Sequence, residues 1–168
     1  MFPKRTRLKT FAYTGCYRYF LTFCTHQRHD AFVCRKTVGD VHAQIVRAAQ
    51  ECGFAIHAYA FMRDHVHLLV EGITEVSDLR LFARLAKQYS GYAHAQRGMG
   101  RLWQPSYFEH ILREEEDTTS VIAYIMNNPI RAGYARTFGE YEYAGSDTTS
   151  MTDIAEVLRS NPRPPWEP

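Results

Sequence analysis

The sequence predicts an α+β fold, namely a ferredoxin-like split βαβ sandwich in which two helices cover one face of an antiparallel sheet. The order of the predicted elements is β-α-β-β-α-β, a short turn joins the second strand to the third, and one further helix follows the last strand. The 168 residues, of which 45% are hydrophobic and 23% charged, suffice for one ordinary core. We therefore expect a single domain over residues 1–160, followed by a flexible, proline-rich tail over residues 161–168.

Three strands and one helix are predicted in the amino-terminal half. Aromatic and β-branched residues concentrate in the first strand, where alternate side chains share one face. Apolar residues at helical spacing define the helix, and Gly53 stands where that helix should end. The turn Arg63-Asp64 joins the other two strands into a hairpin. In chain order, these elements are predicted at residues 17–25, 37–52, 54–62 and 65–71.

The carboxy-terminal half is predicted to contain a long helix, a short strand and a last helix. Ser77-Asp78 can cap the long helix, which the glycines at 98 and 100 interrupt. Residues 107–112 form the short strand. Asp117 or Thr118 can cap the last helix, of which Pro129 marks the weak point or the end. This helix is expected on the face of the sheet that the other two helices leave free.

Composition excludes several classes of protein. No apolar run approaches the ~18–20 residues of a membrane-spanning helix, and the basic start lacks the apolar core of a signal peptide, so we expect a cytoplasmic protein. The four cysteines contain no Cys-x-x-Cys pair, which argues against a zinc ribbon and a disulfide framework. We expect them to be reduced and buried. The net charge of +2 is too small to indicate a nucleic-acid partner by itself.

Two short patterns carry candidate chemistry. His65 and His67 alternate on the third strand, so both imidazoles project from one sheet face, where two fixed nitrogens suit a divalent metal. Tyr124 and Asn128 are one turn apart on the last helix and face the same direction. By chance, the histidine pattern is expected roughly 0.4 times and the tyrosine pattern roughly 0.2 times in this chain. Ordinary strand histidines and a packing tyrosine therefore stay open as alternatives.

Three segments taken together resemble the REP-associated tyrosine transposases, a branch of the single-tyrosine HUH transposase superfamily. The segments are Asp64-His65-Val66-His67, Leu102-Trp103-Gln104-Pro105-Ser106-Tyr107-Phe108-Glu109-His110, and Tyr124-Ile125-Met126-Asn127-Asn128-Pro129-Ile130-Arg131-Ala132-Gly133. The resemblance runs from about Tyr17 to about Tyr143. The family's fold is the split βαβ sandwich already predicted from the order of the elements.

The resemblance also implies an activity and the residues that perform it. It implies a metal-dependent endonuclease that cleaves and rejoins single-stranded, hairpin-associated DNA through a 5′-phosphotyrosine intermediate. Tyr124 would be the nucleophile, His65 and His67 would bind Mg²⁺ or Mn²⁺, and Asn128 would supply a third ligand. Zinc stays open, although imidazole and oxygen donors without a thiolate also suit the other two ions. On a regular helix Asn127 points about 100° away from Asn128, which is the preferred ligand.

The implied partner is single-stranded DNA with a REP-like hairpin, bound by a monomer or a homodimer. Two basic groups are candidates for phosphate contacts, with solvated faces as the alternative for each. The first group lies at helical spacing on the long helix and consists of Arg80, Arg84 and Lys87. The second group lies near the amino terminus and consists of Lys4, Arg5, Arg7 and Lys9. Packing is favoured over base stacking for the nearby aromatic residues Trp103, Tyr107 and Phe108.

Two other functions fit parts of the sequence. A non-catalytic module with an RNA-recognition-like fold also uses a four-stranded sheet, but the aromatic signature run of that module is absent. A metal-dependent phosphodiester hydrolase would use the same histidines with water as the nucleophile. Only the transesterase would form a covalent bond to DNA. Glu71 and Glu109 lie near the motifs and are further candidates to orient a histidine.

Overall fold

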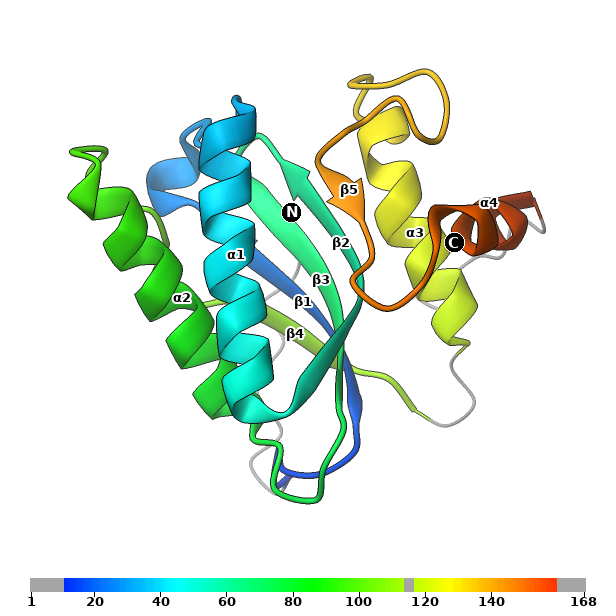
Figure 1. The fold of residues 1–168 in the computed structure, drawn as a ribbon, viewed down its shortest axis with the longest axis horizontal. Helices are drawn as coiled ribbons and strands as arrows, with labels where there is room; N and C mark the ends of the chain where they lie inside the picture. The colour runs from blue at the N-terminus through cyan, green and yellow to red at the C-terminus, as the bar shows by residue number, and fades with distance from the viewer. Residues whose placement is uncertain (1–10, 114–116, 160–168) are drawn as a thin grey trace.

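The computed structural model describes residues 11–113 and 117–159, which form one antiparallel sheet with helices on both faces (Figure 1). Across the sheet, the strand order is β4-β1-β3-β2-β5. This arrangement confirms the predicted α+β class. In chain order, the elements are β1 (Arg18–Cys24), a short 3₁₀ helix η1 (His26–Arg28), α1 (Arg35–Cys52), β2 (Phe54–Met62), β3 (His65–Gly72), α2 (Leu79–Gln96), β4 (Phe108–Ile111), α3 (Thr118–Arg131), β5 (Ala144–Gly145) and α4 (Met151–Arg159).

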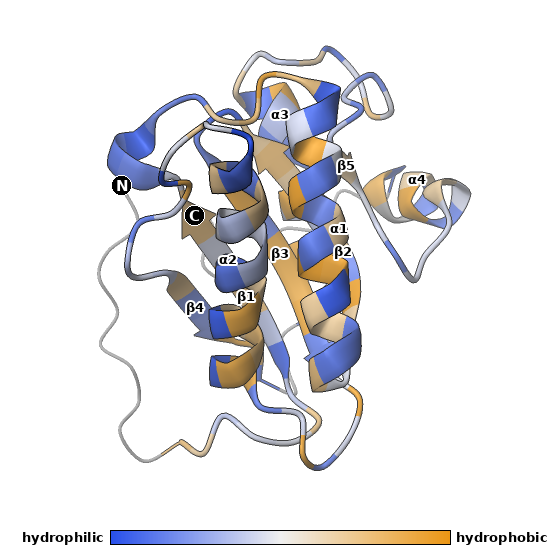
Figure 2. Cartoon of the chain, turned by 60° about the vertical axis from the view of Figure 1, so that its left-hand side comes forward, coloured by the Kyte–Doolittle hydropathy of each residue, from blue (hydrophilic) through white to orange (hydrophobic). Residues whose placement is uncertain are grey.

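Helices α1 and α2 cover one face of the sheet and enclose the larger part of the core. Apolar residues of both helices pack against alternate residues of β1, where Tyr19, Leu21 and Phe23 are fully buried. As expected, α1 ends at Gly53, whose φ of 68° and ψ of 47° lie in the left-handed region that glycine adopts without strain. Figure 2 shows the hydrophobic strands β2 and β3 behind these two helices, along which hydrophobic and hydrophilic residues alternate.

The β2–β3 hairpin forms where the sequence predicts it, with Arg63-Asp64 as its turn. Side chains of β3 alternate between the two faces of the sheet. Val66, Leu68 and Val70 pack under α1 and α2, whereas Leu69 packs in the second apolar cluster. Opposite β3, strand β1 pairs so that Cys24 faces His65 and Thr22 faces His67. Both histidines therefore project away from α1 and α2.

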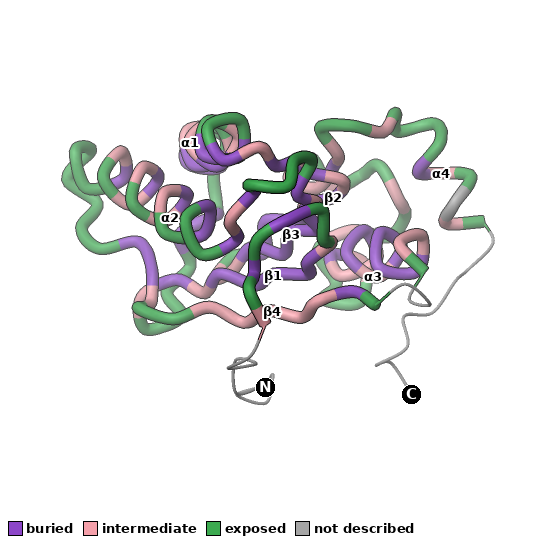
Figure 3. The backbone as a smooth tube through the Cα atoms, turned by 90° about the horizontal axis from the view of Figure 1, so that it is seen from below, coloured by how far each residue is buried: buried purple, intermediate pink, exposed green. Residues whose placement is uncertain are grey.

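Helix α3 covers the second face of the sheet, as predicted. Its apolar residues pack on Phe20, Ala58, Ala60 and Leu69 in a smaller cluster. The side chain of Asp117 caps this helix by accepting hydrogen bonds from the backbone amides of residues 119 and 120. Helix α3 continues two residues beyond Pro129 and ends at Arg131. Figure 3 shows buried residues concentrated in β1 and β3, between the two helical layers.

Three elements of the structure were not predicted, one of which is the 3₁₀ helix η1 after β1. Strand β5 contributes two residues that pair with β2, and α4 places Ile154 in the α3 cluster. The cysteines are free, as expected, but only Cys52 is buried. The predictions for the tail and for Lys4, Arg5, Arg7 and Lys9 fall outside the described residues. Within the described residues, no helix combines the length and the hydropathy needed to cross a membrane.

The glycine at the end of β3 gives a test of this packing. A Cβ atom on Gly72 would lie 2.2 Å from the carbonyl oxygen of Gly15 and 2.9 Å from the Cβ of Ser77. We expect Gly72→Ala to lower the free energy of unfolding by about 1–3 kcal/mol, because the backbone must shift. The control is Gly39→Ala in α1, where no atom lies within 4 Å. This substitution should raise stability by about 0.5–1 kcal/mol. Urea denaturation measures both, and equal effects would contradict the packing at Gly72.

Candidate active site

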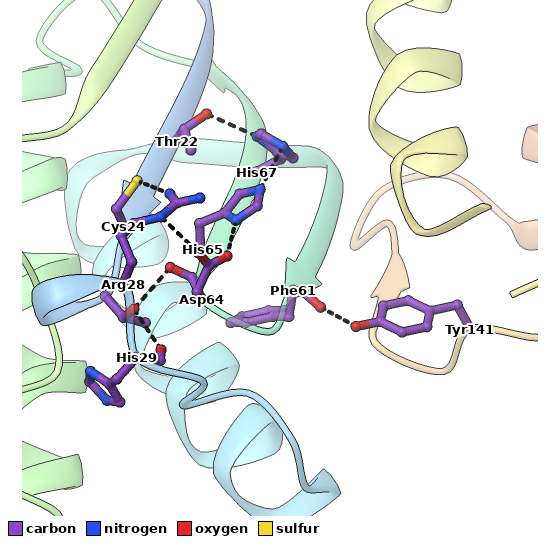
Figure 4. Close-up of polar contacts among 10 residues, drawn as sticks. Thr22, Cys24, Arg28, His29, Phe61, Asp64, His65, His67 and Tyr141 are labelled. Atoms are coloured by element: carbon purple, nitrogen blue, oxygen red, sulfur yellow. Dashed lines mark hydrogen bonds and ion pairs between the residues drawn. The ribbon is translucent and has the colours of Figure 1, made fainter. Parts of the chain in front are cut away.

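His65 and His67 face one another on the α3 side of the sheet (Figure 4). Their Nε2 atoms are 3.1 Å apart, and the two rings are inclined at 79°. Two nitrogens that each bind one ion at about 2.1 Å are separated by roughly 3.0–3.4 Å for bond angles between octahedral and tetrahedral values. The spacing of this pair therefore fits two ligands of one cation.

The outer nitrogen of each imidazole is held by a neighbouring side chain. His65 Nδ1 lies 2.6 Å from Asp64 Oδ1, and His67 Nδ1 lies 2.9 Å from Thr22 Oγ1. A carboxylate can only accept from Nδ1–H, so Nε2 of His65 carries the lone pair and is the acceptor in the 3.1 Å contact with His67 Nε2. Such outer partners orient the histidine ligands of metals in general. Asp64 and Thr22 thus orient the imidazoles, a role for which the sequence had suggested Glu71 or Glu109.

Burial keeps both imidazoles in the form that binds metals. The side chain of His65 is 15% exposed, and burial lowers its pKa even though Asp64 acts in the opposite direction. His67 is 1% exposed, and burial holds its pKa well below the ordinary value, with the neighbouring His65 adding to the shift. Desolvation disfavours the charged form of histidine. At neutral pH the pair is therefore uncharged and able to donate lone pairs.

Tyr124 approaches this pair from α3. Its half-buried ring lies 6.1 Å from the ring of His67 and 5.8 Å from the ring of Phe20, measured between centroids. The guanidinium of Arg131, two turns farther along α3, lies 5.5 Å from the centroid of the Tyr124 ring. A nearby cation favours a phenolate over a phenol. Sequence reasoning missed Arg131, although its i+7 spacing from Tyr124 placed both residues on one side of the helix.

Asn128 lies one turn beyond Tyr124, with its side chain half-buried. Its amide nitrogen donates a hydrogen bond to the backbone carbonyl of Tyr124 at 2.7 Å, and the amide oxygen is the atom that can bind a cation. Among the described residues, no group of three or more His, Cys, Asp or Glu side chains could hold a metal. A third ligand from the described residues would therefore be of another type, and an asparagine oxygen is suitable.

A sequence profile of the family described as "Transposase IS200 like" matches residues 14–128, a segment that includes the two histidines, Tyr124 and Asn128. The chain belongs to this family. An Escherichia coli K12 relative, the REP-associated tyrosine transposase, is 26% identical over 117 residues, which cover 68% of this chain and 65% of the relative. The chain thus matches slightly less than two thirds of that relative's length.

Two further proteins are similar to this IS200-like chain. A Haemophilus influenzae protein, provisionally given the same name as the E. coli relative, is 22% identical over 139 residues, covering 75% of this chain and 77% of the relative. The solved structure of a REP-associated tyrosine transposase bound to a REP hairpin has a TM-score of 0.70 at 19% identity. The match covers 92% of this chain and 88% of the other. The two chains share one fold.

The basic stripe lies away from the histidines, on the α2 side of the molecule. Arg80, Arg84 and Lys87 line a groove of about 800 Å³ between α2 and the loop before β4, together with Arg101. The two arginines of α2 are exposed. Lys87 is different, because its Nζ donates to the backbone carbonyls of residues 104, 105 and 106 at 2.6, 3.2 and 3.0 Å. Lys87 therefore holds the loop, a use that the sequence pattern did not indicate.

The remaining sequence candidates have structural partners. Trp103 is 5% exposed, packs in the larger core cluster and donates its indole N–H to Ser90. Tyr107 and Phe108 also pack against the two apolar clusters, as favoured from the sequence. Glu71 lies 2.6 Å from His57, and Glu109 pairs in register with Leu21, whose side chain faces α1 and α2. Neither glutamate orients the histidine pair.

The contrast between Lys87 and Arg84 gives a stability prediction. We expect Lys87→Ala to lower the free energy of unfolding by about 1–3 kcal/mol, because three backbone carbonyls lose a charged donor. Arg84→Ala should change it by less than about 0.5 kcal/mol, since its one contact of 3.4 Å with Gln88 is exposed. Chemical denaturation gives both values. A Lys87 variant as stable as the Arg84 variant would mean that Lys87 does not secure the loop.

Proposed function

We propose that this IS200-like protein is a single-stranded DNA endonuclease and strand transferase with Tyr124 as its nucleophile. The observation that carries the proposal is the position of the Tyr124 ring, 6.1 Å from His67 and on the same side of the sheet as the paired imidazoles. A phenol beside two convergent, neutral nitrogens combines a nucleophile with a place for a cation. That combination is the minimum required for metal-assisted transesterification of a phosphodiester.

The proposed reaction exchanges one phosphodiester bond for another. The phenolate oxygen of Tyr124 attacks the phosphorus atom, and the bond from phosphorus to the 3′-oxygen breaks. The phenolic proton is released, and the departing 3′-oxygen takes up a proton to become a free hydroxyl. The 5′ phosphate stays on Tyr124, so attack by the 3′-hydroxyl of another DNA end reverses the step and rejoins DNA. Arg131, whose guanidinium lies 5.5 Å from the centroid of the Tyr124 ring, is placed to attract the phosphate.

We assign the metal ligands to His65, His67 and Asn128. When bound, Mg²⁺ or Mn²⁺ supplies a Lewis acid that withdraws charge from the phosphate oxygens. The protein's own contribution is orientation: Thr22 and Asp64 fix the two imidazoles from behind. Burial between the sheet and α3 keeps these rings neutral.

The competing tyrosines lack this environment. Tyr141 donates its hydroxyl to the backbone carbonyl of Phe61 at 2.6 Å, and burial raises its pKa to about 12. The pKa of Tyr143 is also raised, first by desolvation and then by Glu142. Tyr134 is 41% exposed, stacks on Tyr141, and has the guanidinium of Arg63 at 5.4 Å from its ring centroid. Tyr107 packs against the α1 and α2 core, on the other face of the sheet.

We propose single-stranded DNA with a REP-like hairpin as the substrate. The support is family membership, together with the solved relative that is described as bound to a REP hairpin. The groove beside α2 is the proposed surface for phosphates, because exposed Arg80 and Arg84 line one wall and Arg101 lies in the same groove. Lys87 is left out of this set of phosphate contacts, because its ammonium group holds the loop before β4.

The covalent intermediate gives the direct test of the nucleophile. Incubation with a hairpin oligonucleotide carrying a single-stranded flank and Mn²⁺ should produce a DNA–protein adduct, which mass spectrometry should locate on Tyr124. Tyr124→Phe should abolish the adduct while retaining DNA binding, because only the attacking oxygen is removed. His67→Ala should reduce it by at least about 100-fold through loss of the cation. Tyr134→Phe is the matched control and should react like the wild type.

Three other outcomes of this experiment would each contradict a different part of the proposal. Cleavage without an adduct in the wild-type protein would indicate a metal-dependent hydrolase that uses water. Binding without cleavage under all divalent ions would indicate a non-catalytic module. An adduct on another tyrosine would overturn the assignment of Tyr124.

The salt dependence of binding tests the groove. Each phosphate contact contributes a slope of about −0.7 in log affinity against log salt for single strands and about −0.9 for duplex. We therefore expect the double variant Arg80→Ala/Arg84→Ala to bind the hairpin oligonucleotide more weakly, with a slope shallower by about 1–2. Arg47→Ala is the control, because Arg47 lies on α1 and pairs with Glu51 at 3.0 Å. Equal slopes for the double variant and the wild type would exclude phosphate contacts by these arginines.

A further inference from the structure

A strained turn lies beside the histidine pair. Immediately after β1, the residues of η1 include Gln27 with a φ of 54° and Arg28 with a φ of 58°. Two consecutive residues other than glycine in the left-handed region cost conformational free energy. Such strain persists only where surrounding contacts determine the conformation, and it concentrates at functional sites.

Hydrogen bonds join this turn to the β2–β3 hairpin. The backbone amide and the hydroxyl of Thr25 both donate to the carbonyl of Asp64, each at 2.9 Å, and the same hydroxyl contacts the carbonyl of His29 at 2.8 Å. On the other side, the amide of Phe32 donates to the carbonyl of Arg63 at 3.0 Å. The turn is therefore fixed relative to Asp64, the residue that precedes His65.

The strained conformation directs the side chain of Arg28 toward the site. Its Nε lies 2.7 Å from Asp64 Oδ2, and its Nη1 donates to the sulfur of Cys24 at 2.8 Å (Figure 4). The second oxygen of the same carboxylate, Oδ1, contacts His65 Nδ1 at 2.6 Å. One carboxylate thus bridges the guanidinium and the imidazole, and each of its oxygens has its own partner.

We infer that Arg28 is a positioning residue that acts through Asp64 to hold the imidazole of His65 at the angle at which its Nε2 meets that of His67. This inference rests on the proposed function, because the aligned nitrogens are the proposed metal ligands. A free aspartate side chain can rotate and present either oxygen. The contact with Arg28 fixes that rotation, and the carboxylate then fixes the ring.

A second ion pair nearby shows how the Arg28–Asp64 contact differs in solvent exposure from an ordinary surface ion pair. Arg63, on the same hairpin turn, lies 3.6 Å from Asp30, and both side chains are more than half exposed at 57% and 56%. That pair reaches no histidine. The Arg28 side chain is itself 48% exposed, but that of Asp64 is only 22% exposed, so the contact is shielded from water on its carboxylate side.

The test is a double-substitution cycle read out by metal affinity. Binding of Mn²⁺, followed by the electron paramagnetic resonance signal of the free ion, needs no DNA and no turnover. Arg28→Gln and Asp64→Asn should each weaken binding by about 10-fold, which is typical for the outer partners of a ligand. Because Arg28 acts through Asp64, the double variant should bind no more weakly than Asp64→Asn alone. Arg28→Lys should recover part of the loss, and the control Arg63→Gln should match the wild type.

A second measurement on the metal-free protein separates this inference from the proposed function. Nitrogen-15 NMR of the imidazoles should show His65 protonated on Nδ1 in the wild type and a mixture of the two ring forms in Arg28→Gln and Asp64→Asn. Wild-type affinity and an unchanged ring form in Arg28→Gln would overturn the positioning role while leaving the metal site intact. If the losses of Mn²⁺ affinity in the two single variants add in the double variant, the positioning role would also be overturned, since Arg28 would then act independently of Asp64. A wild-type protein with the expected ring forms but no DNA adduct would instead refute the proposed function alone.

Discussion

The pairing register between β1 and β3 is the constraint on which the rest of the site depends. It sets Thr22 opposite His67 and sends Val66, Leu68 and Val70 into the core under α1 and α2. A slip of one residue would exchange the two faces, moving the histidines into that core and the apolar residues toward α3. The fully buried aliphatic side chains therefore stabilise the fold and determine where the imidazoles lie. Placement of the histidines follows from the packing of their neighbours.

A second packing layer brings Tyr124, the proposed nucleophile, to the two histidines. Helix α3 docks on the sheet through an apolar cluster that includes Phe20, and the ring of Phe20 contacts both His67 and Tyr124. The same burial excludes water and lowers the pKa of both histidines. Apolar packing therefore positions Tyr124 beside the two histidines and keeps both imidazoles neutral. Arg131 and Asp64 supply the charges at the edge of this dry region.

Local sequence patterns predicted the hairpin, the three helices α1, α2 and α3, and the position of Tyr124 on α3, because each depends on residues close together in the chain. Strand β5 has only two residues, so it offers no alternation to detect. Helix α4 did have a signal, since Ser150 and Asp153 exchange the hydrogen bonds of an N-terminal cap. The partner of His67 could not be predicted, because Thr22 is 45 residues away and becomes its neighbour only through the register of two strands. The bond between Lys87 and the loop before β4 likewise depends on tertiary structure.

The convergence of His65 and His67 on one cation is the central claim, and anomalous X-ray diffraction from crystals soaked in Mn²⁺ tests it most directly. The account predicts one strong manganese peak within bonding distance of both Nε2 atoms and of the side-chain oxygen of Asn128, on the side of the sheet that carries Tyr124. A peak elsewhere, for example between His57 and Glu71, with none between His65 and His67, would contradict it.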